Sequence, residues 1–531
     1  MAQLQPVLIA GQWRPSRSAG SFSPLNPSTR QSTGEVFPVS SLEEVEEVIA
    51  VAAQASEALL AVPAEARARF LERFAERIEA RRAEIVALAH AESGLPVKPR
   101  LDEVELPRTT GQLRQAAQAA RQSSWTLPTI DTKAGIRSCF APLEGGVVVF
   151  GPNNFPLAFN SVSGGDFAAA IAAGNPVIAK ANSSHPGTTR LLAEEALAAL
   201  KETGLPPATV QLIYRTDHQV GQRLVSHPLV GATGYTGSRH AGLVLKEAAD
   251  RAGKPIYLEL SSINPVLLLP GALRERGAEI AGEFATSCLV GAGQFCTNPG
   301  IVLLLAGTET EQFITAVVEK FRAAPVGTLL GEGVERSLAQ SVAALQKAGA
   351  ELLVGGQAGG GAGCSFNNTL LRVSGARFLA ASEALQQEAF GNASLLVIAQ
   401  DEAQAEAICR AFEGNLTGAL YTDRAGGDEA LYQRLAPILR RKVGRLLEDK
   451  MPTGVAVSPA MNHGGPYPAT GHPGFTAVGI PSSLRRFAML QSFDNVRPHH
   501  LPPELRDKNP TGQLWRLIDG AWTQGDMPAK S

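Results

Sequence analysis

The spacing of apolar residues divides the chain into a helical segment followed by two series of alternating strands and helices. Between Leu42 and about Ser93, apolar residues recur every three or four positions with charges between them, which predicts two surface-packed helices. From Gly145 onward, short apolar runs predict parallel strands joined by helices. The strands are expected at 146–150 (GVVVF), 176–180 (PVIAK), 210–214 (VQLIY) and 255–260 (PIYLEL), and helices from Thr188 to Gly204 and from Ser238 to about Gly253.

A second alternating series begins near Ser262 and predicts a second α/β domain. Its elements are a helix at about 275–290, a strand at IVLLL, helices near 310–323 and 336–348, and a strand at SLLVIA. The glycine-rich run at 355–363 does not connect a predicted strand to a predicted helix. It is therefore interpreted as a flexible surface turn and not as a phosphate-binding loop. Residues 123–142 are irregular and predict an extended arm, and the tail after Pro502 has no periodic core pattern.

Composition and charge point to a soluble protein that acts on a small molecule. The chain has 531 residues, of which 44% are hydrophobic and 18% charged, enough for at least two cores. Lys and Arg total 48 against 50 Asp and Glu, so no net charge attracts nucleic acid. No apolar run reaches the ~20 residues that span a bilayer, and no basic segment precedes an apolar one at the start. A cytoplasmic location without membrane contact is expected.

One of the five cysteines stands in an unusual context. The cysteines are scattered, odd in number and without a C-x-x-C pair, which disfavours a disulfide framework or a zinc knuckle. Cys296 lies in GQFCTNPG, where Gly293 and Pro299 favour a tight turn that exposes the thiol and points backbone N–H groups at a bound oxygen. This geometry suits a nucleophile that attacks a carbonyl. Packing inside the core is expected for the other four, which are Cys139, Cys288, Cys364 and Cys409.

Two further residues complete the candidate catalytic set. Glu259, in the strand text YLELSSINP, is a candidate base, and its competing interpretation is a solvated strand carboxylate. Asn154, in FGPNNFPLAF just after a strand, is a candidate amide donor, and its competing interpretation is a turn-forming asparagine. Taken singly, each competing interpretation is reasonable. The catalytic interpretation is favoured only by the resemblance of their order and surroundings to a known family.

The motifs together resemble the aldehyde dehydrogenase superfamily from about residue 7 to residue 500. The matches are N-F-P at Asn154, the glutamate context from Glu259 to Pro265, G-Q-x-C at Cys296, and the cofactor loop ending in Gly237 and Ser238. The resemblance implies an α/β aldehyde dehydrogenase fold. Its expected parts are a Rossmann-like dinucleotide-binding domain (1–122 and 143–261), a catalytic α/β domain (262–483), an oligomerisation arm (123–142 and 484–500) and a C-terminal tail (501–531).

The closer resemblance is to the branch of α-ketoglutaric semialdehyde dehydrogenases and similar NADP-preferring bacterial enzymes, although the C-terminal segment matches less well. It implies NAD(P)-dependent oxidation of an aldehyde, here a carboxylate-bearing semialdehyde, to the acid. Cys296 would carry a thiohemiacetal and then a thioester, the Asn154 amide would hold the oxyanion, and Glu259 would activate water. A CoA-acylating dehydrogenase and a non-redox thiol acyltransferase or hydrolase are the alternatives. Ser163 stands where many family members have a lysine.

The expected cofactor is NADP, with NAD as the alternative. A G-x-G-x-x-G fingerprint is missing, but Gly237 and Ser238 precede a helix whose positive N-terminus suits a pyrophosphate. The resemblance implies that Lys180 reaches the adenosine ribose and that Glu388 and Phe390 contact the nicotinamide ribose and ring. NAD-specific relatives tend to place a glutamate three residues after the lysine. The neutral hydroxyl of Ser183 there, with Arg215 nearby in sequence, favours a 2′-phosphate.

The remaining expectations concern substrate, metal and assembly. Arg108 is a candidate anchor for a substrate carboxylate, with a structural ion pair as the competing interpretation, and Phe159 and Phe295 are the other candidate substrate contacts. The histidines show no ligand spacing, so no catalytic metal is predicted, and for His463, in a loop expected near the site entrance, packing or loop hydrogen bonding is expected. The resemblance implies that the arm joins subunits by strand addition, giving a homodimer, with a homotetramer as the alternative, and the exposed backbone edges of such an arm explain why it needs a partner.

Overall fold

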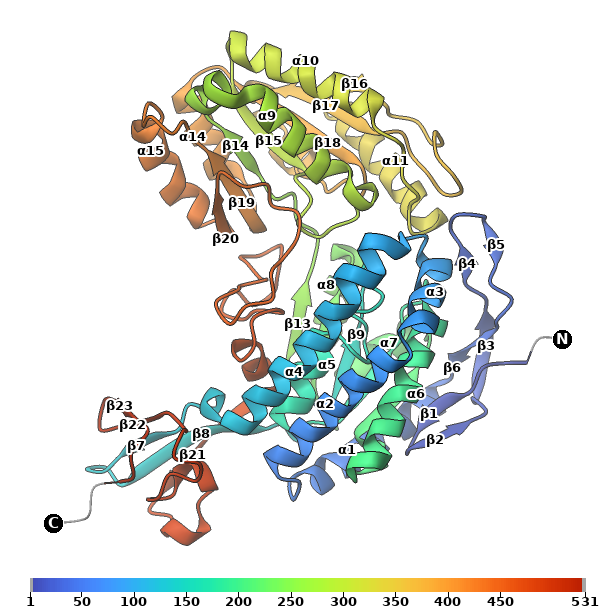
Figure 1. Cartoon of the computed structure of the whole chain (residues 1–531), viewed down its shortest axis with the longest axis vertical. Coiled ribbons are helices and arrows are strands. Elements are labelled where there is room, and N and C mark those ends of the chain that lie inside the picture. The colour runs from blue at the N-terminus through green and yellow to red at the C-terminus, as the bar shows by residue number, and fades with distance from the viewer. Residues whose placement is uncertain (1–2, 528–531) are drawn as a thin grey trace.

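A computed structural model describes residues 3–527 as two α/β lobes with a small β-rich arm at one end (Figure 1). The lower lobe in Figure 1 contains the amino-terminal half of the chain, and the upper lobe is built around β14 to β20. The predicted α/β class and the presence of two sheets are confirmed. Within residues 3–527, no helix is both long enough and apolar enough to cross a membrane.

The lower lobe is built on a seven-stranded sheet whose central strands are parallel and buried. All four predicted strands are present, because their continuous apolar runs are covered by helices on both faces. An edge that the sequence pattern did not predict is added by β1, which pairs antiparallel with β11. In sheet order the strands are β13 (Ile256–Glu259), β12 (Val230–Thr236), β9 (Gly146–Phe150), β10 (Val177–Lys180), β11 (Val210–Ile213), β1 (Val7–Ile9) and β2 (Gln12–Arg14).

The helices of the lower lobe depart from the prediction in two places. The segment predicted as two helices forms three, because the chain leaves helical geometry at Arg81. The helix expected to start with a hydroxyl cap at Thr188 starts at Pro186 instead, and the buried Glu92 carboxylate accepts its Gly187 and Thr188 N–H groups at 2.8 Å. The helices are α1 (Leu42–Leu59), α2 (Ala64–Ala80), α3 (Arg82–Ser93), α4 (Leu106–Gln122), α5 (Gly165–Ala173), α6 (Pro186–Thr203), α7 (His218–Ser226) and α8 (Arg239–Arg251).

The upper lobe contains a second seven-stranded sheet, parallel except for its edge strand β16. In sheet order the strands are β16 (Glu351–Val354), β17 (Thr369–Ser374), β18 (Ala393–Ala399), β15 (Ile301–Leu305), β14 (Val266–Leu268), β19 (Asn415–Tyr421) and β20 (Val443–Glu448). The covering helices are α9 (Pro270–Leu289), α10 (Thr308–Ala323), α11 (Glu332–Lys347), α12 (Gly375–Ala380), α13 (Ser382–Leu385), α14 (Glu402–Ala411) and α15 (Glu429–Arg440). The three helices predicted here are present but begin two to five residues early.

The arm at the lower left of Figure 1 is a five-stranded sheet formed by distant parts of the chain. Its order is β21 (Ala488–Asp494), β8 (Ile136–Pro142), β7 (Thr129–Asp131), β22 (Arg516–Ile518) and β23 (Ala521–Thr523). The tail therefore contributes two strands to the arm, although its sequence lacks a periodic pattern. Strands this short carry too few residues for an alternation to be visible.

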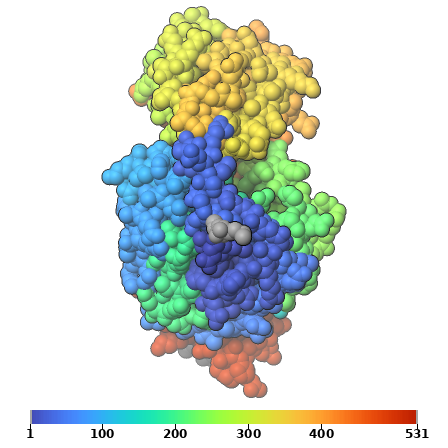
Figure 2. Space-filling model, turned by 90° about the vertical axis from the view of Figure 1, so that its right-hand side faces the viewer, coloured from blue at the N-terminus to red at the C-terminus, as the bar shows by residue number. Residues whose placement is uncertain are grey.

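The lobes are also joined by the amino-terminal segment. It forms two small hairpins, β3 (Ser18–Phe22) with β6 (Phe37–Ser40) and β4 (Leu25–Asn26) with β5 (Gln31–Ser32). Figure 2 shows this blue segment reaching the base of the upper lobe. The contact includes a Cys364 N–H bond to the Pro27 carbonyl at 2.8 Å and an ion pair between Arg30 and Glu335 at 2.9 Å.

The remaining short helical segments connect these elements. They are η1 (Val97–Glu105), η2 (Ser124–Thr126), η3 (Pro207–Thr209), η4 (Val290–Gly293), η5 (Ser482–Phe487), η6 (Pro498–His500) and η7 (Pro503–Leu505). η1 leads into α4 and η4 leads into the loop that carries Cys296. Both segments lead into elements that contribute residues to the site between the lobes.

Candidate active site

Cys296 occupies a tight loop between η4 and β15, as the glycines around it predict. The backbone at Gly293 has φ +68°, and a Cβ there would lie 2.1 Å from the Gly391 carbonyl oxygen, so a side chain is excluded. From the other side, the Asn264 amide donates to the Cys296 carbonyl at 2.9 Å. The loop leaves the thiol half-buried, whereas the other four cysteines are buried.

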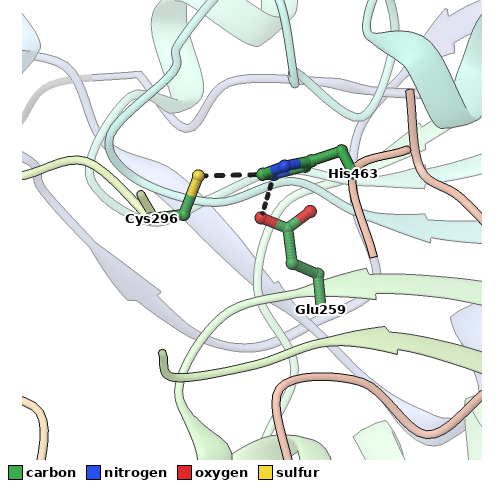
Figure 3. Close-up of side chains that lie close together, drawn as sticks. All are labelled: Glu259, Cys296 and His463. Atoms are coloured by element: carbon green, nitrogen blue, oxygen red, sulfur yellow. Dashed lines mark hydrogen bonds and ion pairs between the residues drawn. The ribbon is translucent and has the colours of Figure 1, made fainter. Parts of the chain in front are cut away.

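The thiol faces a histidine and a glutamate from two other parts of the chain (Figure 3). His463 Nε2 lies 3.4 Å from Cys296 Sγ and 2.7 Å from Glu259 Oε1, so the same ring nitrogen serves both contacts. The loop hydrogen bonding expected of His463 is present, since its backbone N–H donates to the Thr476 hydroxyl at 2.8 Å, but the contacts of its ring with the thiol and Glu259 are not predicted from the sequence. His463 lies more than 160 residues from the cysteine in sequence, and no local pattern indicates the contact.

Glu259 ends β13 with its side chain directed into the site. Only 4% of the residue is exposed, which rules out the solvated strand carboxylate considered from the sequence. Its Oε1 contacts His463, and its Oε2 is buried without a hydrogen-bond partner. Because an unpaired buried carboxylate oxygen is costly, Oε2 is a ready acceptor for a proton from the thiol or from water.

The resting form of the nucleophile is the thiol. Burial, together with the Glu259 charge, raises the pKa of Cys296 well above the ordinary 9.0, and Arg108 opposes that shift only in part. A nearby base is therefore needed to remove the proton as the sulfur attacks.

This raised pKa predicts how Cys296 reacts with an alkylating agent. Since the thiolate is a small fraction below the pKa, iodoacetamide should modify the cofactor-free enzyme about tenfold faster for each pH unit, with no plateau below about pH 9. The Cys296 peptide, quantified by mass spectrometry, gives the rate. A plateau already present at about pH 7 would contradict a protonated resting thiol.

Asn154 lies across the loop from the thiol. Its amide nitrogen donates to the Gln294 carbonyl at 3.0 Å, two residues before Cys296, and 5% of the residue is exposed. A buried ion pair fixes the Asn154 loop, because Arg100 donates to the Asn154 carbonyl at 2.8 Å and to Glu105 at 2.6 Å. The second proton of the Asn154 amide nitrogen is therefore available to an oxygen bound near Sγ.

One cavity of about 590 Å³ connects the thiol with the predicted cofactor residues. Gly237 and Ser238 line it at the end of β12, where the Ser238 hydroxyl caps α8. Glu388 and Phe390 line it from the upper lobe. Burial raises the pKa of Glu388 to about 7, and its Oε1 accepts the Ser262 N–H at 3.3 Å. Asn154, Glu259 and Cys296 belong to the same lining, and the Gly237 N–H donates to the Glu259 carbonyl at 3.1 Å.

The cavity fits a dinucleotide. A helix N-terminus with a capping serine suits a pyrophosphate, and the carboxyl ends of parallel strands are where such ligands bind. At Gly237 a Cβ would meet the Tyr235 hydroxyl at 2.6 Å, which keeps side-chain bulk away from this wall. The sequence analysis missed two residues beside Ser238. They are Arg239, which pairs with Glu413 at 2.9 Å, and His240, and both line the cavity.

Three predicted cofactor residues lie outside this lining, at the ends of the neighbouring strands. Lys180 ends β10, Ser183 follows it, and Arg215 follows β11. Burial and the Arg215 charge lower the pKa of Lys180 to about 8. Among the described residues, the charged neighbour that shifts the pKa of Lys180 is therefore the Arg215 cation and not a carboxylate.

The predicted substrate residues form an aromatic cluster beside the thiol. The Phe155 ring lies 5.2 Å from Phe159 and 5.7 Å from Phe295 between centroids, and the Arg108 guanidinium lies 5.0 Å from the Phe159 ring. Arg108 donates once, to the Val455 carbonyl at 3.1 Å, while its Nε and second Nη are buried without partners. The structural ion pair that was the alternative for Arg108 does not form.

Arg445, which the sequence analysis missed, supports the loop above this cluster. It donates to the carbonyls of Pro452 and Gly454 at 3.0 and 3.1 Å, and Arg108 holds Val455 in the same loop. No motif around Arg445 signals this role, because its partners are backbone groups that the folded loop brings into reach.

Comparison with known proteins agrees with this geometry. The Aldehyde dehydrogenase family profile matches residues 13–436. The "Alpha-ketoglutaric semialdehyde dehydrogenase 2" of Azospirillum brasilense is 39% identical over 529 residues, covering 98% of this chain and 99% of that protein. The "Alpha-ketoglutaric semialdehyde dehydrogenase" of Acinetobacter baylyi is 35% identical over 527 residues, covering 97% and 98%.

Solved structures share the fold. A Thermus 1-pyrroline-5-carboxylate dehydrogenase with bound NAD has a TM-score of 0.79 at 23% identity, with 93% of each chain covered. An aldehyde dehydrogenase of Pseudomonas syringae in complex with NAD+ and octanal has a TM-score of 0.79 at 21% identity, with 94% of this chain and 98% of that chain covered. The two-lobed arrangement with an arm is therefore the architecture of those proteins.

Proposed function

Because the chain belongs to the aldehyde dehydrogenase family and so oxidises an aldehyde with a nicotinamide dinucleotide, we propose that its substrate is a carboxylate-bearing semialdehyde and its cofactor NADP. α-Ketoglutaric semialdehyde is the example proposed, because two relatives at 39% and 35% identity are named for it. The observation that carries the assignment of the reaction is the single cavity, which opens the Cys296 thiol to the same space as Ser238, Glu388 and Phe390.

In the proposed mechanism, Glu259 Oε2 takes the Cys296 proton as Sγ bonds to the aldehyde carbon. The carbonyl oxygen becomes an alkoxide that the Asn154 amide stabilises. A bound nicotinamide dinucleotide supplies the acceptor for the hydride that this carbon loses. Glu259 then releases the thiol proton to solvent. Water attacks the thioester left on Cys296 and gives a proton to Glu259, the carbon–sulfur bond breaks as the acid departs, and Glu259 returns this proton to the sulfur. His463 positions Glu259 through its 2.7 Å contact with Oε1.

The preference for NADP rests on the charges at the adenosine end. Lys180 and Arg215 lie near each other, and Ser183 introduces no negative charge beside them. A 2′-phosphate would be attracted by the two cations, whereas a glutamate at the Ser183 position would repel it.

The cofactor preference is tested by steady-state kinetics. We expect kcat/KM to be at least about tenfold higher with NADP+ than with NAD+, which corresponds to about 1.4 kcal/mol. Ser183→Glu should lower kcat/KM for NADP+ by about tenfold or more and leave NAD+ nearly unaffected, because a like charge opposes the 2′-phosphate. Ser183→Ala is the neutral control and should change the ratio little. A preference of the parent enzyme for NAD+ would overturn the assignment.

The proposal of a carboxylate-bearing substrate is supported by Arg108. A guanidinium with two buried, unpartnered nitrogens beside aromatic rings lacks the acceptor that such a group requires. Burial lowers the pKa of Arg108, and the charges at Cys296 and Glu105 act against that shift. A carboxylate at the far end of the aldehyde would accept two hydrogen bonds from it.

Arg108→Leu should therefore lower kcat/KM for α-ketoglutaric semialdehyde by about 30- to 100-fold, mainly through KM, because charged hydrogen bonds are lost. An uncharged aldehyde of similar length should be affected little. The matched control is Arg114→Leu, on the same helix, whose guanidinium pairs with Glu79 at the surface. Equal losses for the charged and uncharged aldehydes would remove the anchor and leave the oxidation itself in place.

The two alternative activities predict different products. A CoA-acylating enzyme would need CoA to release the acyl group, and a thiol hydrolase would act without reducing a dinucleotide. The free Oε2 of Glu259 favours water as the acceptor, and the cofactor cavity disfavours a purely hydrolytic role. Formation of free acid and NADPH in equal amounts without CoA separates the three.

The domain boundaries predicted from the sequence, the cytoplasmic location and the homodimer stay proposals, with a homotetramer as the alternative assembly. The arm supports the dimer, because β21 and β23 are its edge strands and Met489, Leu490 and Trp522 are exposed on it. Such an edge and apolar surface suit strand addition by a second copy.

A further inference from the structure

We propose that Cys296, His463 and Glu259 form an inhibitory zinc site, which holds Zn²⁺ when substrate is absent. The inference rests on the proposed function in one respect, namely that Cys296 is the nucleophile whose occupation stops turnover. The proposed zinc ion would not be a catalytic metal, because it would bind the same side chains that carry out the oxidation and so block them.

The three side chains are zinc ligands of three kinds within reach of one ion. Their ligand atoms all lie within 4.8 Å of one another. Tetrahedral Zn²⁺ with bonds of about 2.3 Å to sulfur and 2.0–2.2 Å to nitrogen and oxygen places ligand atoms about 3.3–3.6 Å apart. The Sγ to Nε2 distance of 3.4 Å already fits this range. The Nε2 to Oε1 distance of 2.7 Å would have to open by roughly 0.6 Å, a small rotation of the glutamate.

The direction of the contacts favours a common centre over a linear proton relay. In a relay triad, the imidazole uses one ring nitrogen toward the nucleophile and the other toward the carboxylate. Here Nε2 makes both contacts, and Figure 3 shows the sulfur and the carboxylate oxygen converging on that nitrogen. A single Nε2–H reaches both acceptors only as a shared donor, whereas a cation between the three ligand atoms would engage all of them at once.

The unpartnered Glu259 Oε2 is an independent indication of a missing ligand. It is buried in a residue that is only 4% exposed and has no hydrogen-bond partner. A divalent cation held by one or both carboxylate oxygens would compensate this charge. Thiolate and carboxylate together balance the two positive charges of the ion, with a neutral imidazole as the third ligand.

The entry path to the three side chains and the number of ligands also match those of a zinc site. Cys296 and Glu259 line the cavity of about 590 Å³, which provides an entry path and room for a water as fourth ligand. Three protein ligands with an open position are the pattern of an exchangeable zinc site. On binding, Zn²⁺ would displace the Cys296 proton to solvent. Because the ion would be bonded to both the sulfur and Glu259, it would compete with the aldehyde.

The test is a titration of the metal-free, full-length enzyme with Co²⁺ and Zn²⁺. Co²⁺ should give a thiolate-to-metal charge-transfer band at one equivalent, Zn²⁺ should displace it, and Zn²⁺ binding should weaken as the pH falls. Cys296→Ser should lose the band, and His463→Gln and Glu259→Gln should each weaken Zn²⁺ binding by about 100-fold or more. His499→Gln, at an exposed position in the arm, is the control and should bind like the parent.

Measurements of enzyme activity distinguish a failure of the zinc site from a failure of the proposed function. Zn²⁺ should inhibit aldehyde oxidation at the concentration that fills the site, protect Cys296 from iodoacetamide, and be reversed by a chelator. Absence of the charge-transfer band, or Zn²⁺ binding that is unchanged in both Cys296→Ser and His463→Gln, would overturn the zinc site. Failure of the metal-free enzyme to oxidise any aldehyde would instead overturn the proposed function and leave the metal titration to be judged by itself.

Discussion

Cys296→Ala is expected to abolish aldehyde oxidation, lowering kcat by about 10⁴-fold or more. The reason is that the sulfur forms the bond to the carbonyl carbon, and no other described nucleophile reaches that position. The other four cysteines are buried. The side chains of Glu259 and His463 point toward the Cys296 sulfur (Figure 3). NADPH formation followed by absorbance, with substrate in excess, measures the loss.

The matched control is Cys409→Ala, which removes a buried thiol from α14 in the core of the upper lobe. This variant should keep its activity and lose only about 1 kcal/mol or so of stability, because one small group leaves a packed core. Cofactor binding to Cys296→Ala, measured by fluorescence quenching, should match the parent. Turnover in Cys296→Ala within tenfold of the parent would remove the covalent mechanism.

Glu259→Gln should leave an enzyme that stalls after the first half of the reaction. Steady-state kcat is expected to fall by about 10²- to 10⁴-fold, because the base that activates water is lost. The amide keeps the shape of the side chain and an oxygen for the His463 contact, so the thiol stays in place. Hydride loss from the first adduct needs no base, so a burst of NADPH near one equivalent per site should still precede the slow phase, but it should rise more slowly than in the parent because the thiol proton must go to solvent.

Rapid mixing with substrate in excess measures the burst amplitude, and mass spectrometry after acid quenching should find an acyl group on Cys296. A burst as fast as that of the parent would show that Glu259 is not the acceptor of the thiol proton. Steady-state turnover equal to that of the parent would sink the assignment of Glu259 as the base for water.

The elements that the sequence predicted well are those that depend on local physics. Apolar runs such as GVVVF and IVLLL form buried strands because each can be covered only by helices on both faces. The glycines before Cys296 fix the loop, since Gly293 requires a backbone with positive φ and no Cβ. Ser238 caps α8 through a contact three residues away. Each of these features depends on a few consecutive residues.

The features that were missed depend on residues far apart in sequence. The start of α6 is set by Glu92 from another helix, and β1 joins the sheet through β11, a partner about 200 residues later. Arg445 and the tail strands β22 and β23 are likewise defined by the segments they meet. Short or irregular segments carry no periodicity, so only their partners reveal them.

The sequence by itself determined the two α/β units, the Cys296 loop and the identity of the residues able to carry out an oxidation through a thioester. Only the tertiary structure decided that His463 joins Cys296 and Glu259 at a single nitrogen, and that two buried nitrogens of Arg108 have no acceptor among residues 3–527. Local order follows from backbone geometry and the spacing of apolar residues. Burial and unpaired charge follow from three-dimensional neighbours, which the order of residues along a chain does not specify.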